Sequence, residues 1–74
     1  MPVSYTANPE LELMVGTYLE DNKKPFTTNE VAKGIQKEFE PVRQALYNLR
    51  NAEQIYIITF DTKEINWIHK SYFK

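Results

Sequence analysis

The hydrophobic pattern of the chain changes its period once, at Ile55, and this change limits the folds available to it. Up to Leu49, apolar residues recur every three or four positions, which is the spacing of amphipathic helices. Residues Ile55–Phe60 and Ile65–His69 are instead rich in β-branched and aromatic residues, as strands are. Asp61-Thr62-Lys63 between them has the composition of a turn. The pattern therefore predicts an α+β fold in which helices precede a β-hairpin.

The first helix is predicted to run from Pro9 to about Asp21-Asn22. Asn8 is a good N-cap, and Pro9 suits the first helical position because an N–H would be unbonded there anyway. The residues expected to face the core are Leu11, Met14, Val15, Tyr18 and Leu19. Leu13 falls on the opposite face of this helix.

The second helix has a start signal in its first residues. Thr27 and Glu30 have the spacing of a capping box, in which each side chain accepts a hydrogen bond from the other residue's backbone N–H. Phe26 and Val31 are placed as a hydrophobic staple across this cap. The residues expected to face inward are Val31, Ala32 and Ile35. Phe39 is expected to close over them from the connecting loop.

Pro41 sets the predicted start of the third helix. A residue before proline avoids the α region, so Glu40 is predicted to lie outside the helix and Pro41 to open it. The helix is predicted to end between Asn51 and Gln54. Its core-facing residues, within an arc of about 100°, are Val42, Ala45, Leu46 and Leu49.

The outward arc of this third helix carries side chains of types that bind DNA. They are Arg43, Gln44, Tyr47, Asn48, Arg50 and Asn51. Arginine can bond guanine through two N–H groups, asparagine or glutamine can do the same with adenine, and tyrosine can reach a phosphate. A solvated helix face is the alternative, but no acidic residue occurs from Val42 to Ala52. The absence of acids favours a functional face.

Two polar residues in the first turn of the second helix extend this hypothesis. Thr28 and Asn29 lie where backbone N–H groups are free and could hold a phosphate. An equal alternative is that they are simply polar neighbours of the cap.

The composition excludes several classes of protein. The 74 residues contain no cysteine, which excludes disulfides and thiolate metal sites. With one histidine and no glycine-rich phosphate loop, we expect neither an enzyme, nor a metal site, nor a cofactor. No segment resembles a membrane span or a signal peptide, so a soluble cytoplasmic protein without membrane contact is expected. The length predicts a single domain, 1–74, whose ends at 1–8 and 71–74 could be flexible.

From Phe26 to Ile68 the order of elements resembles the winged helix-turn-helix family. FTTNEVAKGI is similar to the family's second helix, and PVRQALYNLRNAEQI to its recognition helix running into the wing. INWI is similar to the returning wing strand, which carries a Trp in many members. The small size also resembles that of the short winged-helix regulators of bacterial fimbrial operons. The resemblance implies a transcriptional regulator that binds double-stranded DNA, with its third helix in the major groove and Lys63 of the wing near the flanking strand.

Two features depart from the family pattern. Members usually have a glycine just before the first wing strand, and here Asn51 is expected to take the left-handed conformation instead. Lys63 is flanked by Asp61 and Glu64, which weakens the expected contact between the wing and a phosphate. With a net charge of −1, these departures leave a second function open. It is a winged-helix module that binds another protein, as an adaptor or as an inhibitor of a DNA-binding protein.

The remaining expectations concern aromatic and apolar residues near the C-terminus. Trp67 is expected in the core, and His69 at the surface where its strand ends. Leu13, Tyr72 and Phe73 could form an apolar patch that joins two copies, unless the tail folds back onto the first helix. Because the chain has few cations, DNA binding of useful affinity is expected to need a dimer or a helper protein.

Overall fold

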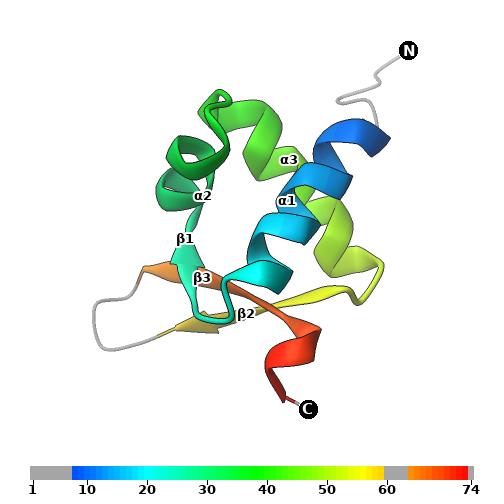
Figure 1. Ribbon diagram of the computed structural model, residues 1–74, viewed down its shortest axis with the longest axis vertical. Helices are drawn as coiled ribbons and strands as arrows, with labels where there is room; N and C mark the ends of the chain where they lie inside the picture. The colour runs from blue at the N-terminus through cyan, green and yellow to red at the C-terminus, as the bar shows by residue number, and fades with distance from the viewer. Residues whose placement is uncertain (1–7, 60–63, 74) are drawn as a thin grey trace.

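The computed structural model describes residues 8–59 and 64–73. Three helices, α1, α2 and α3, gather on one side of a small antiparallel sheet (Figure 1). The elements in chain order are α1 (Pro9–Asp21), β1 (Phe26–Thr27), α2 (Thr28–Ile35), α3 (Phe39–Asn51), β2 (Ile55–Thr59), β3 (Ile65–His69) and the 3-10 turn η1 (Lys70–Phe73). This arrangement confirms the predicted α+β fold with a helix-turn-helix core and a hairpin. The predicted turn at 61–63, with Lys63, lies outside the described residues.

The starts of α1 and α2 confirm the caps predicted from the sequence. The Asn8 side-chain oxygen accepts a hydrogen bond of 3.1 Å from the Leu11 N–H, with Pro9 at the first helical position. Both bonds of the capping box between Thr27 and Glu30 are present, at 2.9 and 3.2 Å. Local sequence therefore fixes where these two helices begin.

The core forms where the inward faces of the three helices meet the sheet. Val15, Leu19, Val31, Val42, Leu46 and Ile55 are almost fully buried. Met14 was expected in this core but is 40% exposed, since it lies beside the shallow depression lined by Leu11, Lys37 and Pro41. The buried positions of α1, Leu11, Val15 and Leu19, are spaced by four residues and form a narrower stripe than predicted.

The sheet has one strand more than the predicted hairpin. Its strand order is β1-β3-β2, and β1 joins by pairing Phe26 with Trp67 and Thr27 with Asn66. Two residues are too few to show a period of two in the sequence. Phe26 therefore both precedes the cap of α2 and extends the sheet, so the helical core and the hairpin are joined by backbone pairing.

The start of α3 corrects two expectations. The helix begins at Phe39, with Glu38 at the N-cap position, so Glu40 is helical and Pro41 is the third helical residue. The first four N–H groups of a helix have no partner within it, so a proline at this position loses no hydrogen bond. Phe39 does not close over α2 from a loop but lies in the first turn of α3, 43% exposed.

Two helices are followed by a residue that has a positive φ and is not glycine. Gln36, at the end of α2, has φ 60°, and Glu53, after α3, has φ 62°. After α3, the N–H of Glu53 bonds to the Arg50 carbonyl and the N–H of Gln54 to the Leu49 carbonyl, which is the Schellman pattern. The left-handed residue before the wing is therefore Glu53 and not Asn51, which is the last residue of the helix.

His69 is buried, contrary to the surface position expected for it. It is 9% exposed because η1 turns back at the end of β3. Its Nδ1 accepts a hydrogen bond of 3.0 Å from the Ser71 N–H and lies 2.9 Å from the Ser71 hydroxyl. The tail is thereby tied to the last residue of the sheet.

Two kinds of feature are absent from the part of the chain that the structure describes. Within residues 8–59 and 64–73, no helix has the length and hydrophobicity to cross a membrane. The same residues contain no group of three or more side chains that could hold a metal ion.

Candidate nucleic-acid interface

The solvent side of α3 carries a row of cationic and aromatic side chains. Arg43, Tyr47 and Arg50 are spaced by four and three residues, so they lie along one face of the helix. Gln44 and Asn51, seven residues apart, lie next to this row. Arg50 and Asn51 are exposed, and Arg43, Gln44 and Tyr47 are partly exposed. We call these five residues the α3 face.

Trp67 holds the α3 face, α2 and the sheet in a fixed arrangement. Its side chain is 1% exposed, which confirms that it is a core residue. The Trp67 indole N–H donates a hydrogen bond of 2.9 Å to the Thr28 hydroxyl. The Tyr47 ring meets the Trp67 ring edge-on, with 5.0 Å between centroids. Tyr47 is therefore positioned by β3, and its ring is restrained before any ligand binds.

Arg43 already has two neighbours on α3. Its guanidinium lies 3.3 Å from the Glu40 carboxylate and stacks over the Tyr47 ring at 5.4 Å. The Arg43 and Glu40 side chains are 43% and 68% exposed, and an ion pair this exposed contributes little stability. A phosphate or a guanine could therefore replace the Glu40 carboxylate at small cost in free energy.

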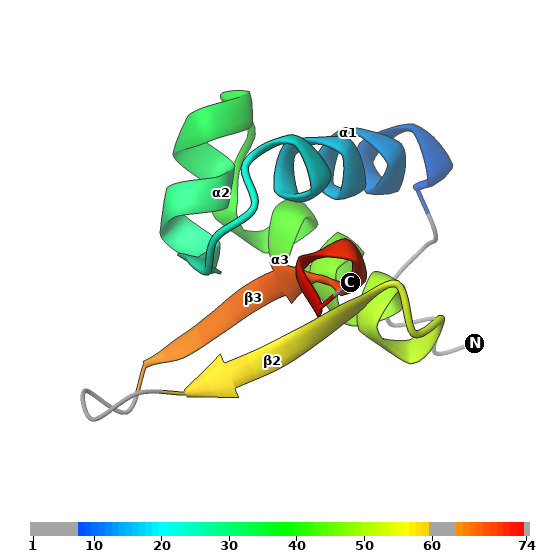
Figure 2. The same cartoon turned by 60° about the horizontal axis from the view of Figure 1, so that its bottom comes forward.

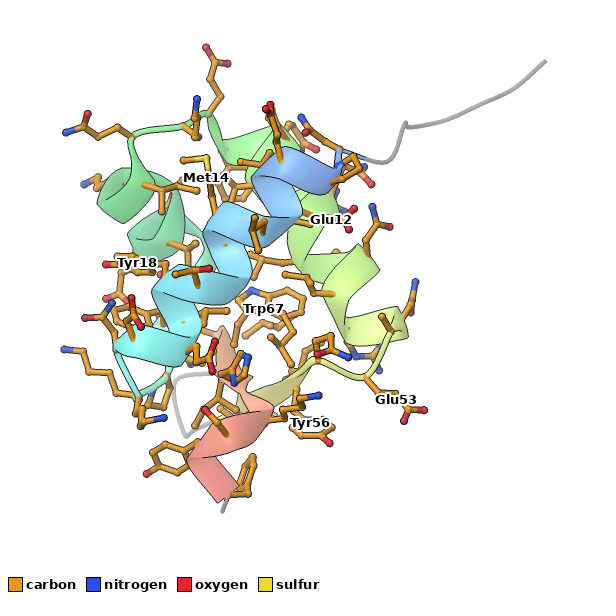
Figure 3. The ribbon with its side chains drawn as sticks, turned by 45° about the vertical axis from the view of Figure 1, so that its right-hand side comes forward. Glu12, Met14, Tyr18, Glu53, Tyr56 and Trp67 are labelled. Carbon is orange, nitrogen blue, oxygen red and sulfur yellow. The ribbon has the colours of Figure 1, made fainter. Side chains whose placement is uncertain are left out.

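Asn48 does not share the α3 face. Its side-chain amide donates a hydrogen bond of 2.9 Å to the Glu12 carboxylate of α1. Figure 3 shows Glu12 on the side of α1 that is next to α3. No acidic residue occurs between Val42 and Ala52 in the sequence. The fold nevertheless places the Glu12 carboxylate, 36 positions away in sequence, beside Asn48 of this helix. No local sequence pattern predicts the hydrogen bond between Asn48 and Glu12.

The N-terminus of α2 borders a depression that the sequence did not reveal. Its volume is about 350 Å³, and it is lined by Thr27, Thr28, Asn29, Phe39, Glu64 and Ile65. The predicted phosphate contacts Thr28 and Asn29 are thus brought beside two exposed apolar side chains, Phe39 and Ile65. The Thr28 hydroxyl already accepts a hydrogen bond from the Trp67 N–H, and it can still donate its own O–H to a ligand.

Formal charge on this side of the molecule is close to balanced. The cations of the α3 face are Arg43 and Arg50, while Glu40 and Glu53 lie at the two ends of α3. Glu53 projects from the turn before β2 (Figure 3). Lys63, the cation expected from the wing, lies outside the described residues. The described charges alone provide a weak electrostatic field for an anionic partner.

Comparison with solved structures supports the fold, whereas comparison by sequence finds no match. No protein-family model matches the chain, and no curated protein is a significant match in sequence. Among solved structures, the apo-Zalpha domain of zebrafish PKZ is similar, with a TM-score of 0.76 and 25% identity over 86% of this chain and 97% of that one. A PKZ Zalpha domain in complex with ds(CG)6 gives 0.75 and 24%, over 84% and 97%.

A bacterial regulator is also similar, with a lower TM-score and over a smaller share of its own chain. MepR, a transcription regulator of the Staphylococcus aureus multidrug efflux pump MepA, has a TM-score of 0.66 and 23% identity. The match covers 85% of this chain but 47% of MepR, so the chain corresponds to about half of that protein. Three helices, a three-stranded antiparallel sheet and these structural matches show that the chain has the winged helix-turn-helix fold.

Proposed function

We propose that this chain is a DNA-binding transcriptional regulator that places α3 in the major groove of duplex DNA. The observation that carries the proposal is the α3 face. One side of the helix is buried through Val42, Ala45 and Leu46, and the other presents arginine, tyrosine and carboxamide groups to solvent. The proposed role involves no catalysis, and we place such a regulator in the cytoplasm.

The structural neighbours support this choice of partner. One Zalpha neighbour is in complex with a double-stranded DNA, ds(CG)6, and MepR is a transcription regulator. In helix-turn-helix proteins the second helix of the motif enters the groove, and the N-terminus of the first approaches the backbone. On this chain these elements are α3 and the first turn of α2, with Thr28 and Asn29 at the backbone.

The proposed contacts divide by position along α3 into contacts with bases and contacts with phosphates. Arg43, Gln44 and Tyr47, in the first half of α3, face base edges, and Arg50 and Asn51 at its end approach phosphates. Lys63 of the wing contributes to the flanking strand in this proposal. Asn48 joins the set only if it exchanges its bond to Glu12 for a bond to DNA.

Fluorescence anisotropy of a labelled duplex at low salt tests the proposal. The probes are ds(CG)6, a mixed-sequence duplex of equal length and the matching single strand. We expect the duplexes to bind with a dissociation constant of about 10⁻⁴ to 10⁻⁶ M at physiological salt and more tightly at low salt, since few phosphates are neutralised. The double variant Arg43→Ala, Arg50→Ala should weaken binding and reduce the salt slope by about 0.9 for each phosphate that the protein no longer neutralises.

A matched control separates the role of the α3 face from that of net charge. Lys33→Ala with Lys37→Ala removes the same charge from the region of α2, where both lysines are exposed and outside the α3 face. Under the proposal this control keeps most of the affinity and of the salt slope. Equal losses in both double variants would mean that the protein binds through net charge and that α3 is not the reader. Binding that does not respond to salt would reject the proposal.

A protein partner is the second candidate function. It is supported by the near-balanced charge and by Leu13, which is 71% exposed. Leu13 lines a groove along α1, together with Glu12, Glu20, Leu49 and His69, that we call the α1 groove. The winged helix would then act as an adaptor or an inhibitor of another DNA-binding protein. Pull-down from lysate treated with nuclease distinguishes the two, because partners recruited through DNA are lost on treatment.

The predicted dimer contact divides into two places. Leu13 lies along the α1 groove, whereas Tyr72 and Phe73 pack together and Phe73 meets Tyr56 of β2. The predicted dimer contact therefore becomes two separate proposals. In one, two copies meet through Leu13, and in the other they meet through Tyr72 and Phe73 of the C-terminal tail. Leu13→Lys and Phe73→Lys, each followed by its mass in solution, test the two contacts independently.

A further inference from the structure

Among the described residues, β2 is an edge strand along its whole length. The strand order β1-β3-β2 leaves β3 as its one neighbour in the described part of the chain. Figure 2 shows β2 outermost in the ribbon, on the side away from α1 and α2. Its other side exposes backbone N–H and C=O groups that can pair with another strand.

The ladder indicates which backbone groups point to this open side. The Lys70 N–H donates to the Gln54 carbonyl at 3.1 Å, which continues the register that pairs Ile55 with His69. In an antiparallel pair the bonded residues alternate, so Tyr56 and Ile58 bond to β3. The N–H and C=O groups of Ile55, Ile57 and Thr59 therefore point outward.

The residues of β2 lack the protection usual on an exposed edge. Natural edge strands carry charges, prolines or bulges that prevent pairing. The sequence of β2 is Ile-Tyr-Ile-Ile-Thr, with no charged residue, proline or glycine. Its solvent side continues into exposed aromatic rings, since Tyr56 is 45% exposed and contacts Phe73, which is 60% exposed. In Figure 3, Trp67 lies between the helices and the strands, and Tyr56 lies on the opposite side of the strands.

We propose that β2 pairs antiparallel with β2 of a second copy of this chain, centred on Ile57. The three outward-pointing residues are symmetric about Ile57, so Ile55 of one copy bonds Thr59 of the other and Ile57 bonds its own counterpart. The sheets of the two copies then join into one of six strands, related by a two-fold axis.

The side chains favour a second copy over an unrelated strand. In this register Tyr56 lies beside Ile58 of the other copy, on the outer face, and the reverse pair forms by symmetry. Aromatic side chains next to β-branched ones are among the stabilising cross-strand pairs. On the helix side Ile57 meets Ile57, so each pair along the edge is uncharged. A five-residue edge is a small interface, so the dimer is expected to be weak.

Amide hydrogen exchange, read by NMR at rising protein concentration, tests the pairing directly. The N–H groups of Ile55, Ile57 and Thr59 should become protected as the protein passes from about 10 μM to about 1 mM, the range of weak interfaces. Those of Tyr56 and Ile58, which bond to β3, should be protected throughout. Sedimentation over the same range should show the mass rising toward that of a dimer.

Two variants and a control make the result decisive. Tyr56→Lys places a charge beside Ile58 of the second copy and should raise the dimer dissociation constant about tenfold or more. Thr59→Lys, at an exposed position at the end of β2, should act in the same direction. Lys33→Glu, at an exposed position on α2, should leave dimerisation unchanged. A protein that stays monomeric at 1 mM, or a dimer lost in Leu13→Lys and kept in Tyr56→Lys, overturns the proposal. DNA binding is not needed for any of these readouts.

Discussion

The helical region and the sheet of this domain are held together by contacts of different range. In the helical region, the starts of α1 and α2 are fixed by residues three positions apart, as in the bond from the Leu11 N–H to Asn8 and the bonds between Thr27 and Glu30. In the sheet, Trp67 meets Phe26 through the backbone and Thr28 through its indole N–H, about 40 residues away in sequence. The comparison teaches that the starts of the first two helices are specified locally, while the wing depends on helices that are already packed.

The largest expected effect tests whether the helical core carries the stability of both regions. Leu46 is fully buried, so Leu46→Ala should lower the free energy of unfolding by about 2–5 kcal/mol, close to the whole margin of so small a domain. Leu49→Ala should lower the free energy of unfolding by less, because Leu49 lines the α1 groove and is partly exposed. Urea unfolding followed by circular dichroism measures both. Equal losses would contradict the burial difference.

A smaller effect tests the link between the two regions. Trp67→Phe removes the N–H that bonds the Thr28 hydroxyl and shortens the ring that meets Tyr47. We expect a loss of about 1–3 kcal/mol in unfolding free energy. Thr28→Val removes the same bond from the other side, so the double variant should lose less than the sum of the singles. Additive losses would show that the wing does not depend on this bond.

This difference in range explains which parts of the fold could be predicted. The caps of α1 and α2, the core residues Val42 and Leu46, and the bounds of β3 all follow from local patterns. β1 could not be predicted, since two residues become a strand only by pairing with β3, where Phe26 meets Trp67. The start of α3 was missed because proline's effect on its neighbour is a preference, and Glu40 is helical here within the turn closed by the bond from the Val42 N–H to the Glu38 carbonyl.

The candidate site shows the same limit. The sequence identified the α3 face because all of its members lie on one helix at helical spacing. It could not show that Asn48 bonds to Glu12 of α1, that Phe39 and Ile65 flank the first turn of α2, or that η1 buries His69. Each of these depends on how separate elements pack.

A third effect, smaller again, uses the two glycines of the helical region. At Gly34 a Cβ would lie 2.8 Å from Cε1 of Tyr18, whose ring packs at 5.1 Å from Phe26. Gly34→Ala should therefore destabilise by about 1 kcal/mol, because overpacking exceeds the gain in helix propensity. At Gly16 the nearest atom would be Leu49 Cδ1 at 3.9 Å, so Gly16→Ala should stabilise by about 0.5–1 kcal/mol. Thermal melts of the pair should shift in opposite directions.

The smallest effect concerns the junction of the two regions, where α3 ends and the wing begins. Glu53 has φ 62° there, which is unfavourable for a residue with a Cβ, so Glu53→Gly should stabilise by about 0.5–1 kcal/mol after the cost in chain entropy. Glu53→Ala removes the charge but keeps a Cβ at a positive φ, so this variant should gain little stability. Asn51→Gly should destabilise, because Asn51 is helical. If thermal melts showed that Asn51→Gly stabilised and Glu53→Gly did not, the left-handed residue would be the one that the sequence favoured, and the junction would be specified locally like the starts of α1 and α2.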